Sequence, residues 1–364
     1  MLGEKKILGL SYIRIIATML VLIGHCTTLS YGTSTHLVDT FSGAFPISQG
    51  IFRLIFSYIY SFHIPLFVTL SGALFDRESN DGHFMNFVKK KVRRLLVPYF
   101  LTATILYIPT RYFIGYYAKG ELTKAFVSDL ILGQDINYLW YLIMLMEVNI
   151  VFYFIRKYAK QFYENRNLCM IIGLAVLNIA GLHLDGLPFQ IHRTLECMLW
   201  FYFGTILRKE VSRFKTIATH KIYMMLVLQL FVFFIYSYLS HYALHVGYGV
   251  AFFSVKLLLE LIRLLLAFLG VLFFWMFCLK IDRELTSVEK EIEAHSFKIY
   301  LLHVPIITMY SWAVQTQLQS YIINDIQYVF FVLLKLVTGL LGSELVIRIL
   351  TVLIGKCGRT WKKQ

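Results

Sequence analysis

Charged residues, proline and cysteine are all scarce in this sequence. Only 15% of its 364 residues are charged and 58% are hydrophobic, whereas an average soluble domain is roughly 25% charged. A soluble chain of this length needs more charged surface than that. The 6 prolines and 22 glycines exclude collagen and proline-rich disorder, and 5 cysteines are too few for a disulfide scaffold. What remains is an integral membrane protein.

Long apolar runs are abundant. A membrane-spanning helix needs about 20 mostly apolar residues, and ten stretches meet or approach this length. They lie at residues 10–30, 51–75, 95–117, 138–155, 168–182, 194–207, 222–245, 255–279, 299–315 and 328–354. Because no long polar segment separates them, we expect one integral-membrane domain over residues 1–364. The predicted fold is all-α and polytopic, with about ten transmembrane helices.

The net charge of +14 is distributed unevenly along the chain. Of the 35 Lys and Arg residues, 25 fall at the two ends and in every second connection, and the other connections hold only Lys119, Lys124 and Arg193. This alternation follows the positive-inside rule, so both termini are predicted to be cytoplasmic. The basic charge then sets orientation in the lipid bilayer and indicates no nucleic-acid partner. We expect a multi-pass protein of the cell membrane.

Seven basic residues fall within the predicted spans, where a charge costs at least about 2.5–3.5 kcal/mol at the centre of a helix. Two of them have a carboxylate on the same helix face: Arg263 follows Glu260 by three residues, and Arg348 follows Glu344 by four. Such pairs neutralise each other locally. We therefore expect both pairs to be structural.

Three further basic residues, Arg53, Arg111 and Lys256, lie near the ends of predicted spans. Long basic side chains in such positions extend toward the interface, and we expect this of all three. Lys335 has no carboxylate nearby in the sequence. Its role is not evident from the pattern.

Arg14 and His25 form a different pattern on the first predicted span. Eleven residues separate them, which on an α-helix returns to within about 20° of the same face, about 16 Å further along. One face thus carries a cation near the cytoplasmic end and a titratable base deeper in the membrane. If this face lines a cavity, a cytoplasmic anionic ligand can contact Arg14 and extend toward His25. The alternative is a buried histidine whose role is structural.

A basic cluster precedes the third predicted span and consists of Lys89, Lys90, Lys91, Arg93 and Arg94. It is typical of charge that sets membrane orientation and contacts lipid phosphates. Guanidinium groups also suit the oxygens of a polyphosphate ligand. Both interpretations stay open on the sequence alone.

Three other elements combine polar and aromatic residues inside predicted spans. The first is Phe62-His63-Ile64-Pro65-Leu66-Phe67, which leads to Ser71-Gly72; the second is Leu139-Trp140-Tyr141-Leu142; the third ends in Tyr300-Leu301-Leu302-His303. Pro, Ser and Gly in a span allow close packing or expose a hydroxyl.

His241 and His245 have zinc-compatible spacing without a third ligand, so no metal site is expected.

Taken together, five elements resemble the acyltransferase family 3 membrane proteins, in the same order along nearly the whole chain. These elements are Arg14 with His25, Phe62 to Gly72, Arg93 to Tyr99, Leu139 to Leu142, and Phe297 to His303. The fourth departs from the commonest form, because Tyr138 stands where a histidine often precedes Leu-Trp.

The resemblance implies transfer of an acyl group, most often acetyl, from cytoplasmic acyl-CoA to a hydroxyl of an extracytoplasmic glycan. Acyl-CoA is then the donor substrate and no cofactor is needed; the acceptor is a surface polysaccharide or a lipid-linked glycan. His25 and Arg14 become the catalytic candidates, with His25 as a general base or as an acyl carrier.

The resemblance also implies binding roles, with the donor phosphates meeting Arg93 or Arg94 as well as Arg14. His63, Ser71 and Trp140 are further candidates for substrate contacts. A polytopic transporter or flippase for lipid-linked sugars is the main alternative, because charged residues in spans are equally expected there. The absence of a visible inverted repeat disfavours it, and short outer connections disfavour a glycan polymerase.

Overall fold

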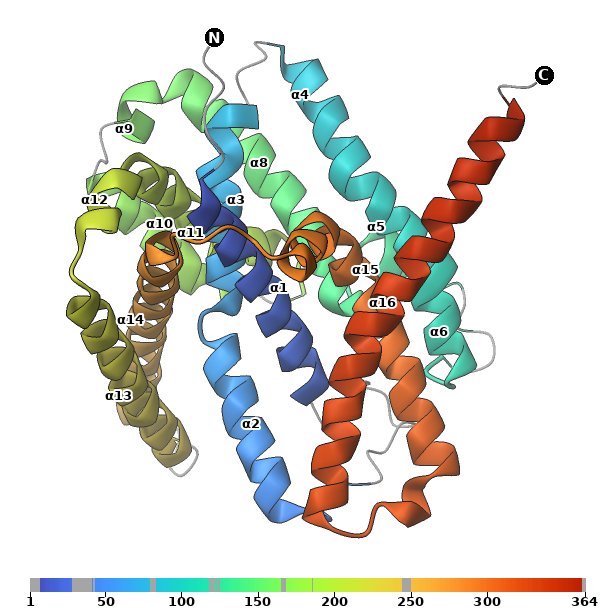
Figure 1. Cartoon of the computed structure of the whole chain (residues 1–364). Coiled ribbons are helices and arrows are strands. Elements are labelled where there is room, and N and C mark those ends of the chain that lie inside the picture. The colour runs from blue at the N-terminus through green and yellow to red at the C-terminus, as the bar shows by residue number, and fades with distance from the viewer. Residues whose placement is uncertain are drawn as a thin grey trace.

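The computed structural model describes residues 7–27, 41, 43–78, 83–117, 121, 123, 125–164, 168–184, 186–243 and 250–361. These residues form helices and no strand, which confirms the all-α prediction (Figure 1). The longer helices are α1 (Leu8–Thr27), α2 (Pro46–Tyr60), α3 (His63–Glu78), α8 (Trp140–Tyr158), α10 (Leu168–Gly181), α11 (Ile191–Lys209), α13 (Thr219–Ala243), α14 (Val250–Lys280), α15 (Ser287–Gln317) and α16 (Asp325–Trp361). The shorter ones include α4 (Phe84–Lys91), α5 (Val97–Thr102), α6 (Ile108–Phe113), α9 (Lys160–Glu164) and α12 (Val211–Thr216).

Seven helical segments of the described chain are long and apolar enough to cross a membrane. They are Leu8–Thr27, Pro46–Phe75, Asn137–Tyr158, Thr219–Tyr242, Ser254–Leu279, Ser287–Gln317 and Asp325–Val352. The other three predicted spans, at 95–117, 168–182 and 194–207, are also largely helical, but α10 is only 14 residues long and α11 carries several charges. The chain is therefore a multi-pass membrane protein.

The predicted span at 95–117 belongs to a longer, interrupted helical stretch that begins at Phe84. Two π-helical segments, Val92–Leu96 and Ala103–Tyr107, alternate with α5 and α6. Pro98 and Pro109 follow them by two residues. Because proline lacks an N–H and crowds the carbonyl four residues earlier, a local widening of the helix accommodates each ring without ending the helix.

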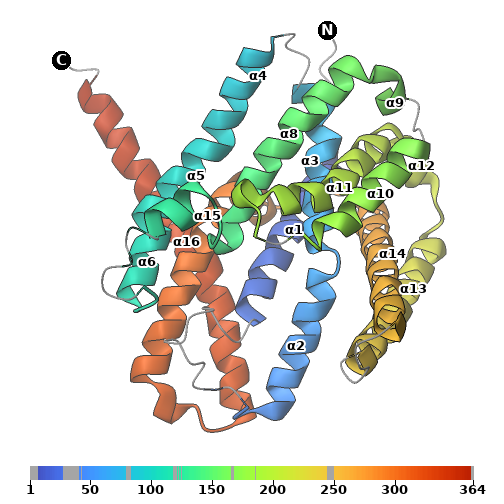
Figure 2. The same ribbon diagram turned by 180° about the vertical axis from the view of Figure 1, so that it is seen from behind.

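The central core is built where α3 and α11 cross, surrounded by α1, α8 and α14 (Figure 2). Two glycines permit the close approach. A Cβ at Gly72 would lie 1.9 Å from the Phe201 carbonyl oxygen, and a Cβ at Gly204 would lie 1.9 Å from that of Thr69. The Thr69 hydroxyl donates to the Trp200 carbonyl oxygen at 3.2 Å across the same crossing. Small residues and interhelical hydrogen bonds hold this crossing together, as is common in membranes.

The basic residues of the predicted spans are accommodated in several ways. The predicted pair of Glu260 and Arg263 is confirmed, with an N–O distance of 3.0 Å. Arg53 and Lys256 have exposed side chains.

The predicted pair of Glu344 and Arg348 is wrong. Arg348 donates to Glu291 of α15, and Glu344 lies 2.7 Å from Nδ1 of His295, also on α15. Because α15 and α16 pack side by side, partners across the helix pair are closer than the partner on the same helix. These contacts tie the two helices together at one end.

The expectation that Arg111 extends toward the interface is also wrong. Its side chain is buried, and its guanidinium lies 3.2 Å from Asp135 and over the rings of Tyr107 and Tyr116. A carboxylate and two aromatic faces satisfy the charge inside the protein, so no extension into solvent is needed.

Candidate functional site

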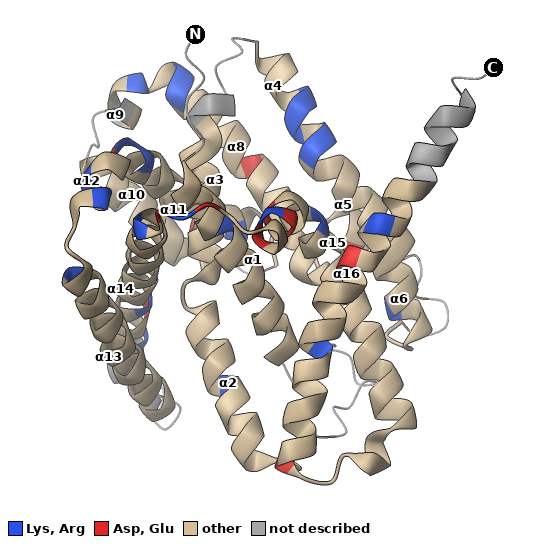
Figure 3. Cartoon of the chain, viewed as in Figure 1, with Lys and Arg blue, Asp and Glu red and all other residues tan. Residues whose placement is uncertain are grey.

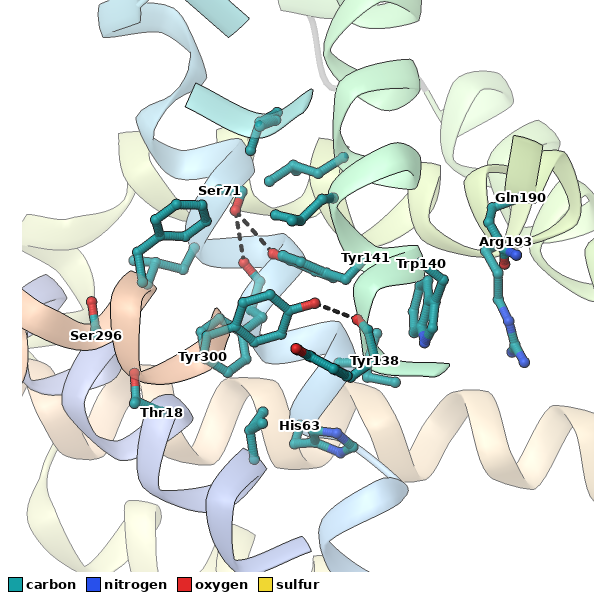
Figure 4. Close-up of a pocket in the computed structure, with 18 of the residues that line it drawn as sticks. Thr18, His63, Ser71, Tyr138, Trp140, Tyr141, Gln190, Arg193, Ser296 and Tyr300 are labelled. Atoms are coloured by element: carbon teal, nitrogen blue, oxygen red, sulfur yellow. Dashed lines mark hydrogen bonds between the residues drawn. The ribbon is translucent and has the colours of Figure 1, made fainter. Parts of the chain in front are cut away.

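A cavity of about 800 Å³ lies between α1, α3, α8 and α15, next to the first π-helical segment. Figure 4 shows that side chains from these separate helices converge on it. It is lined by Arg14, Thr18, Val21 and His25 of α1, by His63 and Ser71 of α3, by Lys91 and Arg94, by Trp140 and Tyr141 of α8, by Gln190 and Arg193, and by Glu293 and Tyr300 of α15, among others. Its size suits a small-molecule ligand.

Helix α1 presents one continuous face to this cavity. Arg14, Thr18, Val21 and His25 all line it, at the spacing that an α-helix gives to one face. The structure therefore places Arg14 and His25 together on the cavity wall, about three turns apart. The 11-residue spacing in the sequence predicted this common face.

Arg14 has a partner that the sequence did not reveal. Its guanidinium lies 3.4 Å from the carboxylate of Glu293, whose side chain is only 7% exposed, against 33% for that of Arg14. Both side chains line the cavity. One sequence signal bears on the position of Glu293: Thr286 and Glu289 form a capping box, which starts α15 well before the predicted span at 299–315. Glu293 therefore lies on the helix and not in a loop.

His25 lies in a group of aromatic and basic side chains. Its ring centroid is 5.1 Å from that of His303, 6.3 Å from that of Tyr138 and 6.4 Å from that of Tyr60. Lys335 of α16, whose role the pattern left open, is buried and close enough to act electrostatically on His25. The titratable ring thus faces residues from α2, α15, α16 and the segment before α8.

His63 lies beside this group at the start of α3. Its Nδ1 is 3.0 Å from the carbonyl oxygen of Ile59, and its ring centroid is 4.4 Å from that of Tyr60. Because a carbonyl only accepts, Nδ1 carries the proton and Nε2 is the acceptor of the neutral ring. His63 lines the cavity (Figure 4) and is close enough to act electrostatically on His25.

The two neighbouring arginines of the basic cluster are separated by the structure. Both residues are exposed, but Arg94 lines the cavity and Arg93 does not. Lys91, which the sequence analysis placed in the cluster but did not select, lines the cavity and is only 7% exposed. The segment Val92–Leu96 is π-helical and has more residues per turn than an α-helix. The spacing rule for an α-helix therefore does not predict which of these side chains face the cavity.

Ser71 and Trp140 lie on facing walls of the cavity. The Ser71 hydroxyl bonds the Phe67 carbonyl oxygen at 3.1 Å and lies 3.3 Å from the Tyr141 hydroxyl (Figure 4). The Arg193 guanidinium lies 5.2 Å from the Trp140 ring centroid. Arg193 and its neighbour Gln190 on the cavity wall were not selected from the sequence.

Tyr138, where the sequence departs from the resembled pattern, is a structural link. Its hydroxyl donates to the Leu301 carbonyl oxygen at 2.7 Å, and the Tyr300 hydroxyl donates to the Tyr138 carbonyl oxygen. These two bonds join α15 to the segment that begins α8. They hold the Tyr138 ring against both His25 and His303.

One group of possible metal ligands occurs in the described ranges, and it lies outside the cavity. The donor atoms of Glu291, His295 and Glu344 all lie within 4.8 Å of one another. Arg348 already donates to Glu291 and so competes with any cation there. Of the two histidines considered from spacing, His245 lies outside the described residues.

A multi-pass helical membrane protein with a polar, histidine-containing cavity is the class that this fold and site define. The family model of the acyltransferase domain, acyltransferase 3, matches residues 7–348, nearly the whole chain. The chain therefore belongs to acyltransferase family 3, and it is an acyltransferase. Comparison with curated proteins and comparison with solved structures gave no match.

Proposed function

We propose that this acyltransferase moves an acyl group, in the simplest case acetyl, from cytoplasmic acyl-CoA to a hydroxyl of an extracytoplasmic glycan. The observation that carries the proposal is the single cavity that joins cationic side chains, His25 and an aromatic wall. A reaction between a polyanionic thioester and a sugar needs these three features together. The family membership supports the acyl transfer itself.

The donor side is formed by Lys91, Arg94 and Arg14. Lys91 is buried and Arg14 half-buried, so water screens their attraction for phosphate oxygens less than it screens that of the exposed Arg94. We place the phosphates of the donor against Lys91 and Arg94. From there the pantetheine arm follows the α1 face past Arg14 toward His25, along about 16 Å of helix.

Beside His25 the acyl group passes from the thioester of the donor to the hydroxyl of the acceptor. The neutral ring removes the proton from the acceptor hydroxyl as its oxygen attacks the thioester carbonyl, and the carbon–sulfur bond breaks. The thiolate of CoA leaves and takes up the proton from the imidazolium. We favour this direct transfer over an acyl-histidine because a cavity of about 800 Å³ has room for the reacting ends of both substrates.

The acceptor side is formed by Trp140, Arg193 and Gln190. An indole face packs against the apolar face of a sugar ring, and amide and guanidinium groups pair with its hydroxyls. This composition supports a glycan acceptor. It also gives Trp140 a binding role on the side of the cavity opposite α15.

We further propose ten membrane crossings, both termini in the cytoplasm, and residence in the cell membrane. Many Lys and Arg positions lie at the end of the molecule where α4, α9 and α12 lie (Figure 3). The start of α1 and the end of α16 face this same end (Figure 1). The distribution supports the orientation inferred from the positive-inside rule.

The test is release of free thiol from acetyl-CoA by the purified full-length protein in detergent. His25→Ala should abolish the release while leaving the melting temperature unchanged. Arg94→Ala should raise KM for acetyl-CoA about tenfold, as expected for loss of one charge-assisted contact worth about 1.4 kcal/mol. Arg93→Ala is the matched control and should keep the wild-type KM.

Two outcomes argue against the proposal. A fully active His25→Ala enzyme excludes the assigned base, and equal effects of the two arginine substitutions exclude the assigned phosphate contact. Movement of lipid-linked sugar across vesicles without any thiol release would favour a flippase. Acid quenching followed by mass spectrometry distinguishes direct transfer from an acyl-histidine, which would add one acyl group to the protein.

A further inference from the structure

His303 is a buried ring close to His25, and the function proposed above gives it no role. Its side chain is 1% exposed, and the two ring centroids lie 5.1 Å apart. A hydrogen bond between two imidazole edges, with nitrogens about 2.9 Å apart, corresponds to a centroid separation of roughly 5 Å once both ring radii are included. The observed centroid distance is therefore one that a hydrogen bond between the two rings can have.

The hydrogen bonds of His303 define which of its nitrogens faces a partner. Nδ1 lies 3.0 Å from the Ile299 carbonyl oxygen, so Nδ1 carries the proton in the neutral ring. Nε2 is then an acceptor. It is buried and has no hydrogen-bond partner within the part of the chain that the structure describes. A buried acceptor of this kind calls for a donor, because leaving it unpaired is unfavourable.

We infer that His303 is a positioning residue whose Nε2 accepts a hydrogen bond from the imidazolium that His25 forms during acyl transfer. The inference rests on the proposed function, in which His25 takes the proton of the acceptor hydroxyl. Both nitrogens of an imidazolium donate. One N–H of His25 then returns its proton to the leaving thiolate, and the other is held by His303. No proton passes to His303, and no other reactant is required.

The remaining surroundings of His25 explain why this acceptor matters. The titratable and charged groups that face it include His63, His303, Lys335, Tyr60 and Tyr138. Lys335 is a cation when protonated and opposes a second positive charge nearby. A neutral imidazole supplies an acceptor without placing a permanent charge in the membrane, which a carboxylate would do.

Packing holds His303 in place for this task. Tyr138 contacts both histidine rings, and its hydroxyl bonds to the Leu301 carbonyl oxygen two residues before His303. The Nδ1 bond to Ile299 limits rotation of the His303 ring. The acceptor nitrogen is thereby oriented before any substrate enters, which is how a positioned group contributes most to a transition state.

The experiment measures kcat and KM for thiol release from acetyl-CoA as a function of pH, with the full-length protein in detergent. His303→Leu removes the acceptor and should lower kcat roughly 10- to 100-fold, the size of effect seen for outer partners of metal-bound histidines. KM should change less than threefold. Because the imidazolium is less stable without its partner, the acid limb of the kcat profile should move to lower pH.

His303→Gln keeps an acceptor oxygen near the position of Nε2. It should retain most of the wild-type kcat and the acid limb of the wild-type pH profile. If the leucine variant does not fold, the glutamine variant is the one measured. His295→Leu is the matched control, since it removes a partly buried imidazole from the same helix outside the cavity. It should keep the wild-type acid limb.

The inference is overturned if His303→Leu keeps the wild-type kcat and acid limb. It is also overturned if the glutamine variant is as impaired as the leucine variant with the same acid limb, because the residue would then act only through packing. A wild-type protein that releases no thiol overturns the proposed function together with the inference. An active wild type with unaffected His303 variants overturns the inference alone.

Discussion

The close crossing of α3 and α11 can be tested by its effect on the stability of the protein. We predict that Gly72→Ala destabilises the protein and that Gly173→Ala does not. A Cβ at Gly72 would lie 1.9 Å from the Phe201 carbonyl oxygen, so the helices must separate by 1.5 Å to reach an ordinary contact of 3.4 Å. The obstacle is helical backbone and cannot rotate away.

The magnitude follows from two opposing effects. Overpacking of a tight site costs about 1–3 kcal/mol, and a backbone obstacle places this site near the upper limit. Replacing glycine by alanine within a helix stabilises the helix by about 0.8–1 kcal/mol, which offsets part of this loss. The net loss for Gly72→Ala is therefore about 2 kcal/mol. At Gly173 of α10 a Cβ would meet nothing within 4 Å, so only the favourable effect remains there.

The assay is thermal unfolding in detergent, followed by tryptophan fluorescence. The melting temperature should fall by several degrees for Gly72→Ala and stay equal or rise slightly for Gly173→Ala. Gly204→Ala should resemble Gly72→Ala, because its Cβ would meet the Thr69 carbonyl oxygen at the same 1.9 Å. If Gly72→Ala melts like Gly173→Ala, the close crossing of α3 and α11 is refuted.

Three further predictions concern single contacts. Asp135→Asn should lower stability by about 1–2 kcal/mol in thermal unfolding, less than a fully buried pair would, because Asp135 is 45% exposed beside the buried Arg111. Tyr138→Phe removes a buried 2.7 Å hydrogen bond and should cost about 1 kcal/mol in the same assay. Glu293→Gln should leave Arg14 more available to donor phosphates, so KM for acetyl-CoA should fall about fivefold, equivalent to about 1 kcal/mol; a raised KM would contradict this.

Features that depend on one helix at a time could be predicted from the sequence. Apolar length predicted the helices, and the 11-residue interval between Arg14 and His25 predicted their common face. The helical repeat is a local property, so spacing alone is enough for both. The pair of Glu260 and Arg263 was predicted correctly for the same reason.

Contacts between helices could not be predicted in this way. Glu293 lies 279 residues from Arg14, and Arg348 pairs with Glu291 of another helix in place of Glu344 of its own. Only the packing of helices determines such partners. Arg93 and Arg94 follow each other directly, so their side chains point about 100° apart on a helix. Spacing alone does not say which of the two faces the cavity, because that depends on how the helix packs against its neighbours.

The register of α1 against α15 connects the two ends of the site. Arg14 pairs with Glu293, and His25 faces His303. These intervals are 11 residues on α1 and 10 on α15, and both increase in the same direction, so the two helices run parallel with almost matched spacing. The ion pair near the basic end therefore limits how far the two histidine rings, about three turns deeper, can move apart. In the reaction that we propose, Arg14 therefore has two roles: it faces the donor, and through Glu293 it holds α15 in the register that His303 needs.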